Sequence, residues 1–113
     1  MNLLQVSQTI NGKIAFEPEI RHTYSFAFAS DLMSDVLRFH MEDTILITGL
    51  STIQTLRTAE MSNVPCIVFA RDKRVTDEML ELAKENHIAI ITAESSVYEI
   101  SGKLYQSGIQ PVY

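Results

Sequence analysis

The 113-residue chain has a formal net charge of −5, with 46% hydrophobic and 20% charged residues. This composition is typical of a globular domain, and we expect one domain over residues 1–113 whose core needs neither disulfides nor metal. The net negative charge and the scattered lysines and arginines argue against a nucleic-acid partner.

No apolar run approaches ~18 residues, and the first residues lack the pattern of a secretory signal, so we predict a cytoplasmic protein without a membrane span. The chain has a single cysteine, Cys66. One cysteine can form no internal disulfide and cannot hold an iron–sulfur cluster. Because Cys66 follows Pro65 at the start of an apolar run, we expect a small buried residue rather than a nucleophile.

The first third of the chain predicts a short helix and two strands. Leu3, Val6 and Ile10 recur at helical spacing before the turn signal Asn11-Gly12. Residues 13–16 predict an edge strand. Residues 24–29 alternate aromatic and small side chains, which predicts a strand with one aromatic face. The face consists of Tyr24, Phe26 and Phe28, and it belongs either to the core or to a contact with another subunit.

Ser30 is the predicted N-cap of the next helix, with Asp31 in its first turn. The spacing indicates an amphipathic helix of about two turns. Its buried side is expected to carry Leu32, Val36 and Phe39, with Met33 and Leu37 beside them.

The stretch from Asp43 to Val64 is the centre of the predicted fold. The apolar run from Thr44 to Thr48 predicts a strand that ends at Gly49, and Ser51 with Gln54 matches a capping box for a following helix. The buried stripe of this helix is expected to be Ile53, Leu56 and Ala59. Residues 66–70, continuously apolar, predict a strand buried on both faces.

The last third predicts helix, strand and helix. Thr76 is the expected N-cap of a helix whose Met79, Leu82 and Ala83 face inward. Residues 88–92 predict the last strand. Ser96 and Glu99 match a second capping box, and Gly108 ends the helix that follows.

From residue 24 onward, strands alternate with helices through short connections. This alternation predicts an α/β fold, a three-layer sandwich with a mainly parallel sheet of four to five strands. The turns that follow the strands should then lie along one edge of the sheet. They are residues 29–31, 48–52, 70–74 and 92–96.

At this edge, hydroxyl groups lie beside helix N-termini, where free N–H groups attract anions. A nucleotide or phosphorylated metabolite is the ligand class that such a site would take. The candidate ligand-binding residues are Thr48, Gly49, Ser51, Thr52, Arg71, Ser95 and Ser96. The alternative is that the serines only cap helices and that Arg71, Lys73 and Arg74 form a solvated loop, because the glycine-rich phosphate-binding motifs are absent.

Groups suited to catalysis are not brought together by the sequence. His22, His40 and His87 are far apart and show no metal-ligand spacing. Asp31 and Asp35 share a face of the expected helix, either as an acid or metal pair or as an acidic first turn. No serine, threonine or cysteine has an evident base partner. We predict no enzymatic activity, no metal and no cofactor, and the open alternative is an enzyme acting through Asp31 or Cys66.

Three runs carry a family resemblance: SDLMSDVL from Ser30, ILITGLSTIQTLRTAEM from Ile45, and PCIVFARDKRVTDEMLELAKENHIAIITAESSVYEISGKLY from Pro65. Together they resemble the DRTGG domain, a small α/β module similar to the N-terminal domain of HPr kinase. Ser51-Thr52 stands where that family has Asp-Arg, and Phe69-Ala70-Arg71 where it has Thr-Gly-Gly.

The resemblance implies a regulatory or assembly module without catalytic residues, often a homodimer, with a possible protein partner in a redox or metabolic complex. Two hypotheses follow. The first is a non-catalytic module that self-associates. The second is a sensor that binds an anionic small molecule at the carboxyl edge of the sheet.

Overall fold

The computed structural model describes residues 1–113 and contains five helices and six strands. None of the helices combines the length and the apolar character that a membrane span requires. In chain order the elements are α1 Leu3–Thr9, β1 Lys13–Phe16, β2 Phe26–Ala29, α2 Met33–Val36, β3 Thr44–Thr48, α3 Ile53–Met61, β4 Cys66–Phe69, α4 Asp77–Asn86, β5 Ala89–Thr92, α5 Val97–Gln106 and β6 Gln110–Pro111.

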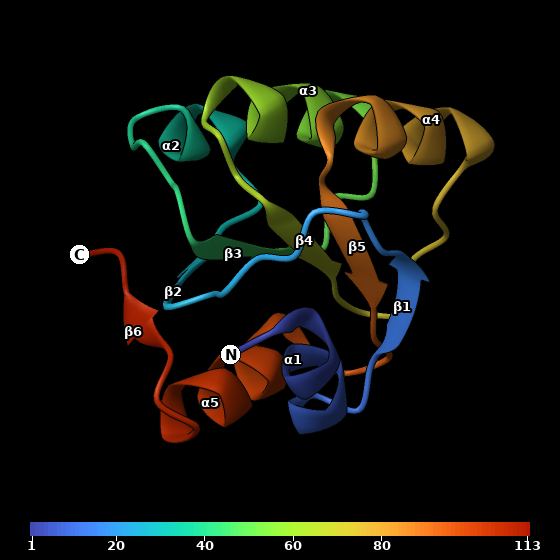
Figure 1. Ribbon diagram of the computed structural model, residues 1–113. Helices are drawn as coiled ribbons and strands as arrows, with labels where there is room; N and C mark the ends of the chain where they lie inside the picture. The colour runs from blue at the N-terminus through green and yellow to red at the C-terminus, as the bar shows by residue number, and fades with distance from the viewer.

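The strands form one sheet in the order β1-β5-β4-β3-β2-β6. Strands β2 to β6 are parallel to one another, and β1 pairs antiparallel with β5 at one edge. Helices α2, α3 and α4 cover one face of the sheet, and α1 and α5 cover the other (Figure 1). The predicted three-layer α/β sandwich is therefore confirmed, with β6 as a strand beyond the four to five expected.

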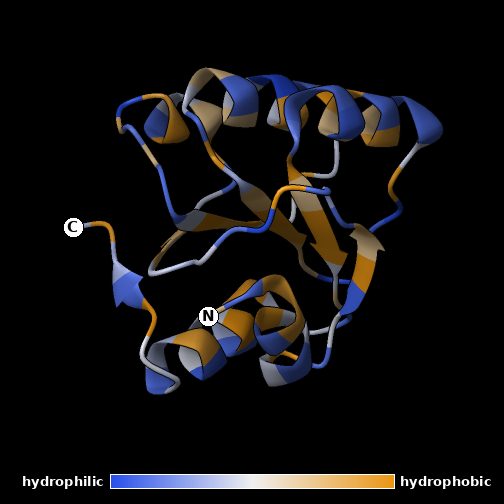
Figure 2. Ribbon diagram, in the orientation of Figure 1, coloured by the Kyte–Doolittle hydropathy of each residue, from blue (hydrophilic) through white to orange (hydrophobic).

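The core lies on both faces of the sheet. Every residue of β3 and β4 is buried, as expected for central strands covered by helices on both sides. Leu46, Ile67 and Ile90 pack in a cluster under α3 and α4, whereas Ile45, Val68 and Ile91 pack in the opposite cluster with α1 and α5. Figure 2 shows apolar residues on the sides of the helices that face the sheet.

The helix predicted after Ser30 is shorter and begins later than expected. Its N-cap is Leu32, without a side-chain cap, and Ser30 instead accepts a hydrogen bond from the Leu32 N–H at 3.0 Å. Leu32 lies outside the helix in an extended conformation and is 59% exposed, whereas Met33 and Val36 within the helix are buried. The predicted cap at Ser30 and the predicted inward position of Leu32 are wrong.

The predicted aromatic face of residues 24–29 is also wrong at its first member. The N–H groups of Ser25 and Phe26 both donate to the Asp43 carbonyl, at 2.9 and 3.2 Å. Two successive residues thus face one partner residue, as in a β-bulge, and the alternation of side chains breaks there. Tyr24 therefore packs in the cluster with α1 and α5, whereas Phe28 packs in the cluster on the other face.

Candidate functional site

The turns after β2, β3, β4 and β5 lie at one edge of the sheet, because these strands are parallel and in register. This carboxyl edge is where ligands bind in open α/β sheets. The predicted gathering of the four turns is confirmed, and the details of their contacts decide what the edge can do.

Asp31, directly after β2, is the centre of these contacts. Its Oδ1 accepts hydrogen bonds from the Thr48 hydroxyl at 2.9 Å and from the Gly49 N–H at 2.7 Å. Nη2 of Arg71 lies 3.5 Å from its Oδ2. Three donors from the ends of β3 and β4 thus converge on one carboxylate, which is the geometry that would also hold an oxyanion of a ligand.

The position of Arg71 depends on an unusual loop after β4. Arg71 and Asp72 both adopt left-handed backbone conformations, with φ of 65° and 55°. Their N–H groups donate to the carbonyls of Ser95 and Ala93, both at 2.9 Å, which ties this loop to the end of β5. The Arg71 guanidinium then lies over Gly49, so closely that a Cβ on residue 49 would collide with it.

These contacts set the electrostatics of Asp31. The Gly49 N–H, together with the Thr48 hydroxyl and the Arg71 guanidinium, holds the pKa of the Asp31 carboxyl below its ordinary value, although partial desolvation opposes the shift. The side chain remains 50% exposed. Asp31 is therefore an ionised carboxylate at the surface.

Three of the predicted ligand-binding residues meet at Asp31, namely Thr48, Gly49 and Arg71. The other predicted residues lie in the neighbouring turns. Thr52, not Ser51, is the N-cap of α3, since its hydroxyl accepts from the Thr55 N–H at 3.3 Å. The Ser51 hydroxyl donates to the Arg74 carbonyl. The predicted capping box at Ser51 is wrong, and ligand binding by these residues stays a prediction.

The last turn of the edge precedes α5. Ser95 takes part through its carbonyl, which accepts from Arg71, and Ser96 caps α5 by accepting from the Glu99 N–H at 3.1 Å. Only this half of the predicted second capping box forms, and the Glu99 carboxylate instead lies 3.5 Å from the Lys103 ammonium group. The predicted caps at Ser96 and Thr76 are confirmed.

The sequence pattern paired Asp31 with Asp35. It did not predict that Asp31 accepts the three donors at the carboxyl edge. Asp31 precedes α2, so the two residues do not share a helical face. The available signal was its place immediately after a strand, which is the same place that the other three turns occupy.

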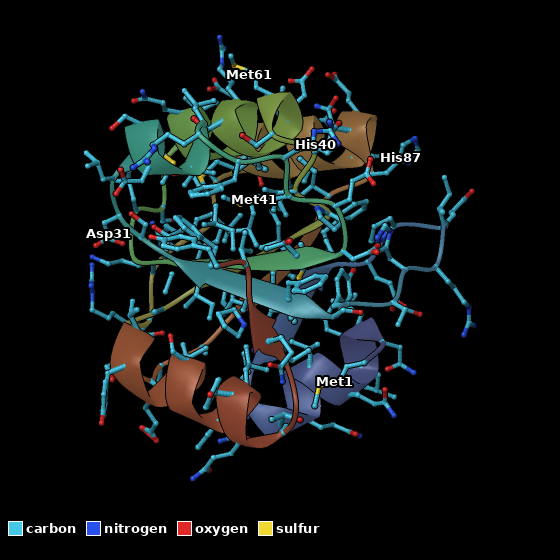
Figure 3. All side chains as sticks on the ribbon, turned by 90° about the vertical axis from the view of Figure 1, so that its left-hand side faces the viewer. Met1, Asp31, His40, Met41, Met61 and His87 are labelled. Carbon is cyan, nitrogen blue, oxygen red and sulfur yellow. The ribbon has the colours of Figure 1, made fainter.

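The histidines lie at the other end of the sheet. His22 Nε2 is 2.7 Å from Asp43 Oδ1, and His40 Nε2 is 3.0 Å from Glu42 Oε1. His87 closes α4 in a left-handed conformation. Figure 3 shows Asp31 at one end of the sheet and His40 and His87 toward the other. No group of three or more His, Cys, Asp or Glu side chains is arranged to hold a metal ion.

Cys66 is fully buried, and this burial raises the pKa of its thiol. We expect the native protein to react with a thiol-specific chromogenic reagent at neutral pH far more slowly than the protein unfolded in guanidinium chloride. Absorbance of the released chromophore measures both rates. Rapid reaction of the native protein would contradict the buried position and restore Cys66 as a candidate nucleophile.

A family model described as the HPr Serine kinase N terminus matches residues 46–107, more than half of the chain. The chain belongs to this family. The match to the HPr kinase N-terminal family begins within β3 and ends just after α5, so it includes Thr48, Gly49 and Arg71 but not Asp31.

Known proteins of related sequence and structure agree with this assignment. HPr kinase/phosphorylase of Streptococcus agalactiae, from serotypes Ia and III, is 36% identical over 58 residues. That segment is 51% of this chain but 19% of the relatives, so the chain spans about a fifth of their length.

A solved structure extends the likeness to nearly the whole fold. The CBS and DRTGG domains of the regulatory region of Clostridium perfringens pyrophosphatase, complexed with the activator diadenosine tetraphosphate, match with a TM-score of 0.72 and 17% identity. The match covers 95% of this chain and 47% of that one. The resemblance to the DRTGG domain and to the N-terminal domain of HPr kinase is thus confirmed.

Proposed function

We propose that this chain is a non-catalytic regulatory module that forms a homodimer and acts on a larger metabolic enzyme system in the cytoplasm. The observation that carries the proposal is an apolar groove of about 590 Å³ beside α5, flanked by the strongly exposed Tyr98 and Tyr105. Large exposed apolar patches on a domain of this size are typical of protein contacts.

The relatives support a regulatory role. One is described as the N terminus of a kinase and the other as the regulatory region of a pyrophosphatase. The groups that could carry chemistry in this chain are engaged elsewhere: Cys66 is buried in the core, and Asp31 binds three donors of its own chain. A partner enzyme in redox metabolism rests on the family resemblance and stays a prediction.

Self-association is tested by the molar mass in solution. We expect light scattering behind a sizing column to give about twice the 12.8 kDa of the chain at micromolar concentration. Dilution should lower the weight-average mass toward that of one chain. A mass of one chain throughout the range up to about 100 times the starting concentration would count against the homodimer.

A second candidate function is a sensor of an anionic small molecule, such as a nucleotide or phosphorylated metabolite, at the carboxyl edge. The convergence of Thr48, Gly49 and Arg71 on one carboxylate supports it, since the same donors suit a phosphate. The pyrophosphatase regulatory region is complexed with diadenosine tetraphosphate, a ligand of this class. Such a ligand would have to take the place of the Asp31 carboxylate, which already binds these donors.

A further inference from the structure

The groove beside α5 exists because α5 covers only part of this face of β2. Ala27 and Ala29 of β2 lie on the side of the sheet opposite Phe28, and their small side chains form part of the groove wall together with Ile47 and Ile109. Strand β6 has two residues, and no helix lies over this part of the sheet beyond α5 (Figure 1). The apolar surface is therefore open to a partner.

The side of α5 that borders the groove has an unusual sequence of large and small residues. Tyr98, Ser101, Gly102 and Tyr105 follow at helical spacing and all line the groove. Tyr98 is 88% exposed and Tyr105 is 67% exposed, whereas Ile100 is buried in the core and Leu104 is buried at the inner wall of the groove. The face thus has an aromatic ring at each end and a flat centre.

The flat centre has no explanation within the chain. A Cβ added to Gly102 would meet nothing within 4 Å, so no neighbouring group requires glycine in the middle of this helix, where glycine is unfavourable. The Ser101 hydroxyl oxygen is the one buried side-chain polar atom without a hydrogen-bond partner. Small residues in a helix allow a second helix to approach closely.

We infer that this face of α5 is the contact between two copies of the chain, with the two α5 helices antiparallel and crossing at Ser101 and Gly102. The inference rests on the proposed homodimer and names its surface. A two-fold axis at the Ser101–Gly102 peptide brings Tyr98 of each copy opposite Tyr105 of the other, because the two tyrosines are equally distant from that peptide. Each ring then covers the groove of the other copy.

The charges on the flank of α5 fit the same arrangement. Glu99 and Lys103 lie four residues apart, two on either side of Ser101, and form an ion pair at 3.5 Å within one helix. In an antiparallel pair, Glu99 of each copy lies near Lys103 of the other, so the contact places opposite charges together. In a parallel two-fold pair the equivalent flanks of the two helices lie on opposite sides of the contact, so this pairing of opposite charges does not form.

The α5 face is large enough for a dimer contact, and the alternative contact, pairing of two sheets through β6, is unfavourable. Four tyrosine side chains supply roughly 500–800 Å² of the about 1,600 Å² that a standard interface buries, and the walls of the two grooves can supply the remainder. Continuation of the sheet through the free edge of β6 is hindered, because Pro111 has no N–H to donate. The α5 face is thus the better contact.

The first test is Gly102→Gln in the full chain. Glutamine is a better helix former than glycine and has open space around it in the monomer, so the unfolding temperature should stay the same or rise. It blocks the close approach of the second helix, and the dissociation constant of the dimer, measured by analytical ultracentrifugation, should increase at least tenfold. Met61→Gln, which changes a 70% exposed side chain on α3, is the control and should leave the constant unchanged.

The second test reverses charges. Glu99→Lys gives two lysines on each α5, so like charges face one another and the dimer should weaken. The double change Glu99→Lys with Lys103→Glu restores opposite charges across the contact and should return the dissociation constant toward that of the wild type. Circular dichroism of each variant checks that the fold is retained.

The outcomes separate this inference from the proposed function. A wild-type dimer that both Gly102→Gln and Glu99→Lys leave intact would overturn the α5 contact while the self-associating module stands. A monomer at all concentrations would overturn both. A small molecule that binds in the groove of a monomeric chain, and is displaced by Gly102→Gln, would also overturn the contact.

Discussion

Replacement of Phe69 by alanine is expected to lower the free energy of unfolding by about 3–5 kcal/mol. Phe69 is fully buried at the carboxyl end of β4 and packs in the cluster under α2, α3 and α4. Its removal loses transfer free energy and leaves a cavity that the flanking strands can fill only in part. Since a domain is stable by about 5–15 kcal/mol, this one change should bring the chain close to the limit of folding.

The matched control is Phe26→Ala on β2. Phe26 is also a strand phenylalanine but is 39% exposed, so its truncation removes less buried area and should cost clearly less. Urea unfolding followed by circular dichroism measures both variants, and the slopes of the transitions should agree. Equal losses for the two variants would contradict the burial of Phe69.

The carboxyl edge should respond to Phe69→Ala as well. The Phe69 carbonyl accepts from the Ala93 N–H at 3.0 Å, and the Ala70 N–H donates to the Thr48 carbonyl at 2.9 Å. The end of β4 therefore links the turns after β3 and β5. A cavity at Phe69 should make the end of β4 less rigid, and Arg71 follows directly after this end. The packing of the core is therefore expected to affect the position of Arg71 relative to Asp31.

Much of this fold could be predicted from local sequence. The run Cys66–Phe69 is apolar throughout, and Thr44–Thr48 has three successive apolar residues between two threonines. Short runs of this kind, rich in β-branched residues, favour strands buried on both faces. Thr76 and Ser96 could be recognised as caps because the hydroxyl bonds an N–H only three residues along the chain.

Features that depend on partners distant in sequence could not be predicted in this way. Strand β6 has two residues, and its pairing with β2 alone defines it. The position of Tyr24 depends on the Asp43 carbonyl, which accepts two successive N–H groups across the gap between β2 and β3. Ser51 satisfies its hydroxyl on the Arg74 carbonyl, so the cap passes to Thr52.

In the candidate site, too, some features could be predicted from the sequence and others depend on contacts between distant residues. Topology alone was sufficient to bring the four turns to one edge, because parallel strands end on the same side. Which groups pair there depends on the left-handed conformations of Arg71 and Asp72. Aspartate is among the residues enriched in that conformation, but arginine is not, so the sequence does not predict it at Arg71. The sequence pattern therefore placed Asp31 at this edge, but it could not show that Asp31 is the acceptor shared by the three donors.

The second large effect is expected from Asp31→Ala. The change removes the acceptor shared by the Thr48 hydroxyl, the Gly49 N–H and the Arg71 guanidinium, and leaves three donors directed at one empty position. Phosphate or a nucleoside triphosphate should then bind there. A ligand at 100 times its dissociation constant adds about 2.7 kcal/mol to the unfolding free energy, which a thermal-shift measurement detects as a rise in unfolding temperature.

Asp35→Ala is the matched control. It removes the same charge two residues into α2, yet the structure gives Asp35 no side-chain hydrogen bond or ion pair, so the donors at Asp31 remain satisfied. In this variant, as in the wild type, an anion must displace the Asp31 carboxylate, so we expect a phosphate-dependent shift smaller than that of Asp31→Ala, with sodium chloride at equal ionic strength as the reference. A wild-type shift as large as that of Asp31→Ala would mean that the anion binds elsewhere.

The pH dependence of Asp31→Asn tests the same contacts without a ligand. Because the folded-state pKa of Asp31 is lowered, mainly by the Gly49 N–H, its carboxylate stabilises the fold above the ordinary value of 3.8, and this contribution is lost as the pH falls through the lowered value. Solvent screening at a half-exposed group limits it to at most about 1 kcal/mol. The difference in unfolding free energy between wild type and Asp31→Asn should thus narrow from pH 7 toward pH 3. A constant difference over this range would show that the three donors do not favour the ionised carboxylate, and an oxyanion of a ligand would then gain nothing from them either.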